Sequence, residues 1–121
     1  MHILIVIAHG SRRKQSNDEI IKLVEELTQS HSHEFDVIKY AFLEIASPNI
    51  PDALLEGINL GAEKISVLPY FLSAGRHVSE DIPIEVAKVS KDYPQINISI
   101  KPHIGSSPVL ATEILRISSD D

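Results

Sequence analysis

The sequence contains no cysteine and no long apolar segment. Without cysteine the chain has no disulfide bond, thiolate metal ligand or cysteine nucleophile, and it fits a reducing compartment. The longest apolar run near the N-terminus, Ile3–Ala8, is far too short to span a bilayer. That run also lacks the basic flank and the cleavage site of a signal peptide. We therefore expect a cytoplasmic protein with no membrane partner.

An excess of basic residues is also lacking. The chain has 11 lysines and arginines against 17 acidic residues, a net charge of −6, which argues against a general nucleic-acid-binding protein. Neither phosphate-binding pattern, G-x-x-x-x-G-K-[ST] or G-x-G-x-x-G, occurs in the sequence. The G-x-S-x-G pattern of a nucleophilic serine is absent as well. Phosphate-loop and serine-hydrolase chemistry are therefore disfavoured.

The patterns that are present predict strands and helices in alternation. With 121 residues, 43% of them hydrophobic, the chain fits a single domain over residues 1–121. Strands are expected over residues 3–7, 35–43, 65–69 and 96–100. Apolar residues at helical spacing follow them, over Ile20–Leu27, Ala53–Ile58, Ile82–Val89 and Leu110–Ile117. Such alternation predicts a doubly wound α/β fold, with a four-stranded parallel sheet covered by helices on both faces.

Local signals predict where the helices begin and end. Ser16–Glu19 has the form of a capping box, and Ser47–Pro48 and Ser107–Pro108 each combine a capping serine with a proline at the first helical position. Gly61 suits the C-terminal cap of the second helix. A flavodoxin-like strand order of 2-1-3-4 is the order we expect, and it places the reversal of strand order between the first and third strands.

Histidines collect where such a sheet binds its ligands, beyond the carboxyl ends of the strands. His9 follows the first strand, His77 lies in the loop after the third, and His103 follows the fourth. A lone histidine is more often merely solvated, but histidines from separate strands that meet at one crevice favour a functional site. The pair His31-x-His33 falls in a turn on the opposite edge, and we interpret it as a surface pair.

Basic residues follow the same strand ends, although the chain is acidic overall. They are Arg12, Arg13, Lys14, Arg76 and Lys101. The planar guanidinium group pairs with carboxylates through two parallel hydrogen bonds. A solvated surface explains Arg12–Lys14 equally well, but a crevice for a polycarboxylate would need such arginines.

Four segments together resemble the short-form sirohydrochlorin chelatases over nearly the whole chain. They are Ala8–Arg12 (AHGSR), Ala41–Pro48 (AFLEIASP), Val67–Leu72 (VLPYFL) and Gly75–Pro83 (GRHVSEDIP). The resemblance implies a doubly wound fold and the insertion of a divalent metal, cobalt most of all, with nickel or iron in some relatives. It implies that His9 and His77 handle the metal and that Glu44 assists them. His103 lies where relatives usually show a proline-rich apolar stretch, so its role stays open.

The implied reaction is the insertion of Co²⁺, Ni²⁺ or Fe²⁺ into sirohydrochlorin during tetrapyrrole biosynthesis of the cobalamin type. The metal is a substrate, and no resident cofactor is expected. Neutral imidazole both binds these metals and accepts protons near neutral pH, which suits His9 and His77, with Glu44 as a second base or orienting group. We predict that the tetrapyrrole contacts two loops, at Gly10, Ser11, Arg12, Arg13, Ser73, Ala74, Gly75 and Arg76.

A homodimer is expected, because one sheet edge offers only one wall to a broad, flat ring, and members of this family resemble half of the larger two-domain chelatases. Two alternatives remain open. A non-catalytic tetrapyrrole or metal carrier would use the same residues but show stoichiometric binding without a product. A regulatory or nucleotide-binding domain would share the flavodoxin-like fold, but the missing phosphate loop argues against it.

Overall fold

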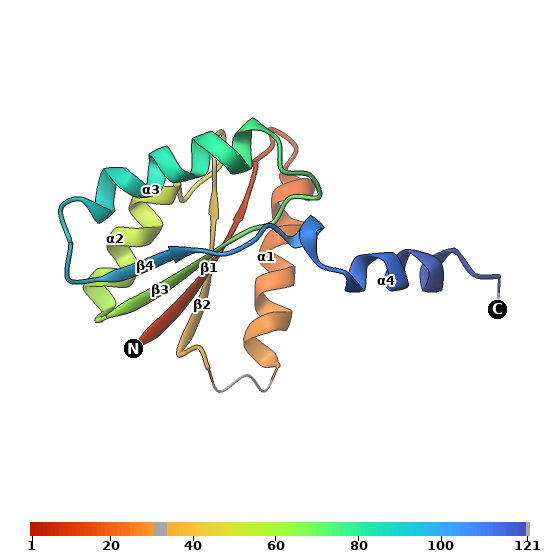
Figure 1. Ribbon diagram of the computed structural model, residues 1–121, viewed down its shortest axis with the longest axis horizontal. Coiled ribbons are helices and arrows are strands. Elements are labelled where there is room, and N and C mark those ends of the chain that lie inside the picture. Colours follow the sequence, from red (N-terminus) through yellow and green to blue (C-terminus); the bar gives the residue numbers. More distant parts are fainter. Residues whose placement is uncertain (31–33, 121) are drawn as a thin grey trace.

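The computed structural model describes residues 1–30 and 34–120, in which strands and helices alternate (Figure 1). The pair His31-x-His33 lies outside the described residues. The main elements in chain order are β1 (His2–Ala8), α1 (Lys14–Gln29), β2 (Val37–Phe42), α2 (Ile50–Leu60), β3 (Lys64–Pro69), α3 (Ile82–Ser90), β4 (Asn97–Ile100) and α4 (Val109–Ser118). Two short turns complete the set, η1 (His77–Asp81) before α3 and η2 (Ile104–Ser106) before α4. No helix in this described part is long and apolar enough to cross a bilayer.

The sheet is parallel, with the strand order β2-β1-β3-β4. Ile3 of β1 stands opposite Val37 of β2 on one side and Ile65 of β3 on the other. The order is the one predicted from the sequence, and the doubly wound α/β class is confirmed. The reversal of strand order therefore lies between β1 and β3, where parallel sheets of this kind form their ligand crevice.

The core lies on the face of the sheet that α2 and α3 cover, opposite α1 (Figure 1). Ile3, Ile5 and Ile7 alternate onto this face and are at most 1% exposed, because strand side chains point to opposite faces in turn. Leu54 of α2 and Ile82 of α3 are fully buried against them. Each such aliphatic side chain stabilises the fold by about 1.5–3 kcal/mol relative to exposure. These buried side chains between the sheet and the two helices therefore form the hydrophobic core of the fold.

Helix α4 covers neither face and projects away from the body (Figure 1). We expected its apolar stripe to pack on the sheet like those of the other helices. Instead Ile114 is 60% and Ile117 is 68% exposed, and α4 contains no buried residue. The expected helical layers are therefore supplied by α1 on one face and by α2 and α3 on the other.

The predicted capping box at Ser16 is wrong. Helix α1 begins at Lys14, so Ser16 is already helical. The side chain of Asn17 is engaged elsewhere: its Oδ1 accepts from the amide of Ser11 at 2.9 Å, and its Nδ2 donates to the Ser11 carbonyl at 2.8 Å. These two hydrogen bonds connect the loop after β1 to the first turn of α1. A capping pattern in the sequence does not predict such a connection.

The predicted cap at Ser47 is also wrong, because α2 starts two residues later. Asn49 is its N-cap, and its side chain accepts from the amide of Asp52 at 2.8 Å. The Ser47–Pro48 peptide bond is cis and lies in the loop before the cap. The predicted C-cap of α2 is confirmed, because Gly61 is in the left-handed region with φ of 108°. At the last helix the prediction is off by one residue: Pro108 is the N-cap of α4, although Ser107 Oγ accepts from the Val109 amide at 3.3 Å.

Candidate active site

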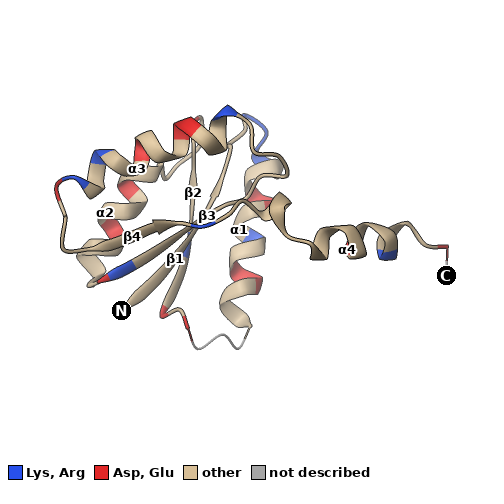
Figure 2. Cartoon of the chain, viewed as in Figure 1, with Lys and Arg blue, Asp and Glu red and all other residues tan. Residues whose placement is uncertain are grey.

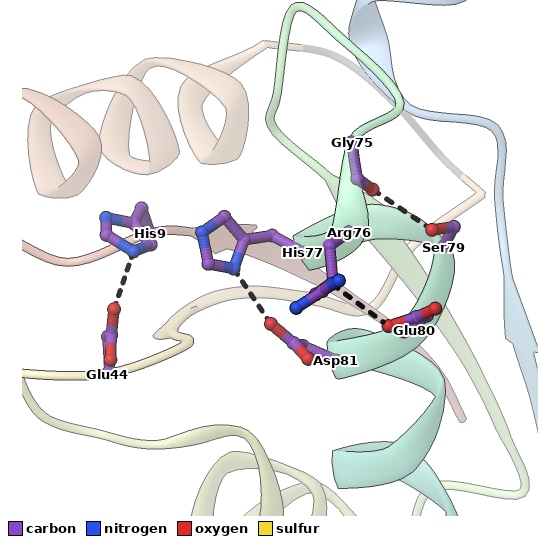
Figure 3. Close-up of polar contacts among 8 residues, drawn as sticks. All are labelled: His9, Glu44, Gly75, Arg76, His77, Ser79, Glu80 and Asp81. Carbon is purple, nitrogen blue, oxygen red and sulfur yellow. Dashed lines mark hydrogen bonds and ion pairs between the residues drawn. The ribbon is translucent and has the colours of Figure 1, made fainter.

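The hydrogen-bond ladder between β1 and β2 continues beyond both strands and sets two polar side chains side by side. The amide of Leu43 donates to the Ala8 carbonyl at 2.9 Å, and the amide of Glu44 donates to the His9 carbonyl at 3.0 Å. His9 Nε2 then lies 2.7 Å from Glu44 Oε1 (Figure 3). The paired backbones therefore place the two side chains next to each other.

Two unusual backbone conformations frame this pair. Gly10 has φ of 95°, and a Cβ there would lie 1.9 Å from the Glu44 carbonyl oxygen, so only glycine fits. Ile45 has φ of 72°, and the amide of Ala46 donates back to the Glu44 carbonyl at 2.8 Å, which closes a tight γ-turn. The missing Cβ of Gly10 thus lets the Glu44 backbone come close, and the contact of Gly10 with the substrate stays a prediction. Strain of this kind tends to persist at functional sites.

His77 comes from the opposite side of the crevice and starts the helical turn η1. This single turn has π-helical hydrogen bonding, with the amide of Ile82 donating to the His77 carbonyl. Such turns are rare and occur often at functional sites. Within the turn, His77 Nδ1 lies 2.9 Å from Asp81 Oδ2. The imidazole rings of His77 and His9 stand 4.7 Å apart, so the structure brings the two predicted histidines together (Figure 3).

The carboxylates determine which nitrogen of each ring is free. An ionised carboxylate only accepts hydrogen bonds, so the neutral His77 must donate through Nδ1 to Asp81, and the neutral His9 must donate through Nε2 to Glu44. The lone pairs then lie on His77 Nε2 and His9 Nδ1. Metal-binding histidines usually donate their second nitrogen to a carboxylate in this way, which fixes the tautomer and raises the basicity of the ligating nitrogen.

The site is open to solvent. The side chains of His9, Glu44, His77 and Asp81 are between 37% and 54% exposed. A hollow of about 210 Å³ beside His77 is lined by Leu43, Glu44, His77, Asp81, Ile84 and Glu85. A second hollow of about 350 Å³ lies on the α1 side and includes His9, Gly10, Ser11 and Tyr70. Among the described residues, no group of three or more metal-binding side chains comes together.

The remaining predicted residues are placed less directly. Figure 2 shows basic residues in the loop before α1 and at the turn before α3. Arg76 forms an ion pair with Glu80, with 3.3 Å between Nε and Oε2, while neither Arg12 nor Arg13 forms an ion pair within the described part of the chain. His103 contacts neither His9 nor His77 among the described residues, and its carbonyl accepts from Ser106. Ser73, Ala74 and Gly75 lie in the loop before η1, and the Gly75 side of that loop has open space around it.

Asp81 is the site residue that the sequence analysis missed. We expected a loop up to Ile82, where the apolar helical stripe begins. The helix in fact begins one turn earlier, and this places His77 and Asp81 at an i, i+4 spacing on one surface. The spacing was visible in the sequence, but it has no meaning until residues 77–81 are known to be helical.

Comparisons with known proteins agree on one family. The CbiX family model matches residues 3–120. A chloroplastic sirohydrochlorin ferrochelatase of Arabidopsis thaliana is 34% identical over 110 residues, which are 88% of this chain and 47% of that protein. A sirohydrochlorin cobaltochelatase of Methanocaldococcus jannaschii is 35% identical over 83 residues, 69% of this chain and 57% of that protein. The chain thus spans about half the length of these curated relatives.

Solved structures give the same result. The sirohydrochlorin chelatase SirB of Bacillus subtilis subspecies spizizenii, in complex with cobalt, has a TM-score of 0.86 and 29% identity, covering 95% of this chain and 48% of that one. A CbiX protein of Marinobacter aquaeolei, named for cobalamin (vitamin B12) biosynthesis, has a TM-score of 0.82 and 26% identity. That match covers 97% of this chain and 93% of the other.

Proposed function

The chain belongs to the CbiX family, and we propose that it inserts a divalent metal ion into a sirohydrochlorin-type tetrapyrrole. The observation that carries the proposal is the histidine pair. His9 and His77 stand 4.7 Å apart at the carboxyl edge of the sheet, and each is held through one nitrogen by a carboxylate. The relatives named as sirohydrochlorin ferrochelatase and cobaltochelatase support this substrate class.

The reaction exchanges one divalent cation for two pyrrole N–H protons, so the site must bind a cation and accept two protons. Lone pairs on His77 Nε2 and His9 Nδ1 suit both tasks, because imidazole binds borderline metals and titrates near neutral pH. Glu44 and Asp81 hold the rings and stabilise the imidazolium that forms when a ring takes up a proton. Solvent access to all four side chains lets the protons leave.

Binding of the macrocycle is assigned to the two loops that flank the histidines. The peripheral carboxylates of the substrate would pair with Arg12, Arg13 and Arg76, and the ring would lie near Gly10, Ser11 and the loop Ser73–Gly75. Arg76 would exchange its ion pair with Glu80 for a substrate carboxylate. Since Arg76 is 80% exposed, this exchange needs no change in the core.

A second copy of the chain would complete the site. The hollow beside His77 has a volume of about 210 Å³, whereas small-molecule sites usually measure roughly 300–1,000 Å³ and bury most of the ligand. A tetrapyrrole would therefore project well beyond this wall. Two-fold association is the commonest way to add an identical second wall, and it makes a homodimer the working form of the proposed enzyme.

The decisive experiment is an anaerobic absorbance assay with sirohydrochlorin and Co²⁺, Ni²⁺ or Fe²⁺ offered separately. We expect catalytic turnover, with Co²⁺ as the preferred metal. Turnover with Fe²⁺ alone would support the proposed chelatase activity but would show that the preferred metal is iron and not cobalt. Spectral changes that stop at one equivalent of metal per chain would identify a carrier, and no change with any metal would overturn the proposal.

A further inference from the structure

The loop that begins at His9 is held by a side chain where the pairing of β1 with β2 ends. The Glu44 amide still donates to the His9 carbonyl. Two residues later, the side chain of Asn17 bonds to both backbone groups of Ser11. The Ser11 amide nitrogen lies 2.9 Å from Asn17 Oδ1, and Asn17 Nδ2 lies 2.8 Å from the Ser11 carbonyl oxygen. One side-chain amide thus pairs with Ser11 as the opposite residue of an antiparallel hydrogen-bonded pair would.

Asn17 serves this loop rather than its own helix. It lies in the first turn of α1, and its side chain bonds to Ser11 and to no other described residue. Asparagine is a weak helix former, because its side chain competes with the backbone for hydrogen bonds. Asn17 is half-buried, whereas its neighbours Ser16 and Asp18 are exposed. The position therefore favours a contact with the loop over helix propensity.

Ser11 passes the constraint on toward Arg12. Its Oγ accepts from the Arg13 amide at 3.0 Å, which closes a short turn with Arg12 in the middle. Arg12 is exposed and forms no ion pair with a described residue, and Figure 2 shows basic residues at this place before α1. A fixed Ser11 therefore fixes the backbone from which Arg12 extends toward a ligand.

The constraint also acts back toward His9. Between His9 and Ser11 lies Gly10, and glycine adopts so many backbone conformations that the loop needs an outside support to keep one of them. The close approach of Gly10 to Glu44 supports one end of this segment, and Asn17 supports the other. All of these residues except Glu44 line the same hollow of about 350 Å³. A shift of Ser11 would therefore change the wall of that hollow and the direction of His9.

We propose that Asn17 is a positioning residue, which acts through Ser11 to hold His9 and Arg12 where the tetrapyrrole needs them. The inference rests on the proposed function and deepens it. It joins a group assigned to chemistry, His9, to a group assigned to binding, Arg12, through one side chain. Misplacement of reacting groups by about 1 Å can cost roughly 100-fold in rate. Loss of Asn17 should therefore lower kcat and raise KM together, although Asn17 is not a metal ligand.

Asn17→Ala removes both hydrogen bonds to Ser11. We expect kcat/KM for metal insertion to fall by about 10- to 100-fold, with kcat and KM both changed. The affinity for metal-free sirohydrochlorin, measured by absorbance titration, should also fall. Gln15→Ala is the matched control, because Gln15 carries the same amide in the same turn, is exposed and bonds to no described residue of the loop. It should behave as wild type, and circular dichroism should show that both variants are folded.

Asn17→Asp is the sharper test, because its effect depends on protonation. The ionised carboxylate accepts from the Ser11 amide but turns a second acceptor toward the Ser11 carbonyl. When the introduced carboxyl is protonated, it donates to that carbonyl and restores both bonds. Its pKa should lie above the ordinary value of about 3.9, because the carbonyl oxygen and partial burial disfavour the negative charge.

The pH dependence follows from that sign. Relative to wild type at the same pH, the affinity of Asn17→Asp for sirohydrochlorin should be lowest near pH 8 and should rise as the pH falls to about 5. The comparison with wild type removes the titration of the substrate and of His9, and the neighbouring Arg12 and Arg13 are the same in both proteins. A weaker helix alone would not give a deficit that acid repairs.

Hydrogen exchange separates the role of Asn17 from the proposed function. The Ser11 amide should exchange slowly in the wild type and faster in Asn17→Ala, with or without a tetrapyrrole. A Ser11 amide that exchanges equally fast in both, wild-type affinity in Asn17→Ala, or an Asn17→Asp deficit that is the same at every pH would each overturn the role of Asn17. A wild-type chain with a protected Ser11 amide that does not bind sirohydrochlorin would overturn the proposed function, and with it the purpose assigned to Asn17.

Discussion

The first strand and the residues just beyond it form two regions with opposite properties. Ile7 is 0% exposed in the core, whereas the side chain of His9, two residues further on, is 44% exposed and held by Glu44. The buried isoleucine side chains of the strand pack in the apolar core, whereas the residues beyond the strand carry polar groups on backbones paired by hydrogen bonds. The contrast indicates that stability and chemistry are separable in this chain, with the border at Ala8.

The largest expected effect is on chemistry. His9→Ala and His77→Ala should each lower metal insertion by about 10²- to 10⁴-fold, because a ligand and proton acceptor is lost. Stability should change by no more than about 0.5 kcal/mol, because both side chains are half exposed. Anaerobic initial rates and urea unfolding measure the two quantities.

His103→Ala is the matched control for these two variants. His103 follows β4 at the same edge but contacts neither of the paired histidines among the described residues, so near wild-type rates are expected. Folded His9→Ala and His77→Ala proteins with wild-type rates would contradict the assignment of the site.

The opposite behaviour is expected in the core. Ile7→Ala should destabilise the fold by about 2–5 kcal/mol, because it leaves a cavity in a fully buried layer. The rate per folded molecule should stay close to wild type at low temperature. Urea unfolding followed by circular dichroism measures the loss, and Leu60→Ala on the exposed end of α2 should cost far less. Equal losses of stability for Ile7→Ala and Leu60→Ala would contradict the distinction between the buried core and the exposed residues.

An intermediate effect is expected for the residues that orient the histidines. Asp81→Asn should lower the rate by about 10- to 100-fold, because the amide still accepts from His77 Nδ1 but no longer stabilises an imidazolium. Glu44→Gln should also slow the reaction less than loss of either histidine. Glu80→Gln is the matched control, because Glu80 is in the same turn and, within residues 1–30 and 34–120, forms its ion pair with Arg76 and not with either histidine. If Asp81→Asn shows no rate loss at any pH, Asp81 does not position His77.

The same border separates what the sequence predicted well from what it did not. The β-branched run Ile3–Ile7 and the alternation of strands and helices predicted the parallel sheet, because burial on both faces leaves a clear pattern in composition. The strand order came from analogy with flavodoxin-like folds rather than from the residues, and the structure has that order. His9 and His77 were singled out because strand ends meet at one edge, and Glu44 because of the resemblance to the chelatases. Asp81 was not, because its role depends on a π-helical turn that no apolar periodicity marks.

Helix α4 shows a further limit of sequence patterns. Its stripe of Leu110, Ile114 and Ile117 was predicted correctly as a helical apolar surface, but the pattern does not say what covers it. Apolar periodicity shows which side of a helix must be buried. The periodicity is the same whether that side packs on the chain's own sheet or on another molecule. The predicted caps at Ser16 and Ser47 failed because other local hydrogen bonds form there. Asn17 bonds to the backbone of Ser11, and Asn49 caps α2 through the amide of Asp52.

The smallest expected effect concerns the exposed arginines. It tests whether, at the carboxyl edge of the sheet, substrate binding and the chemical step depend on different residues. Arg12→Gln/Arg76→Gln should raise the apparent KM for sirohydrochlorin by roughly two- to thirtyfold, since exposed ion pairs contribute about 0.2–1 kcal/mol each. The value of kcat should change less, because peripheral carboxylates are held alike in the ground state and the transition state. Steady-state kinetics at two salt concentrations measure both constants, and added salt should reduce the difference between the variant and the wild type. Arg116→Gln on α4 is the matched control for loss of an arginine, because Arg116 pairs within its own helix. A large loss of kcat with an unchanged KM would show instead that Arg12 or Arg76 takes part in the chemical step together with the histidines.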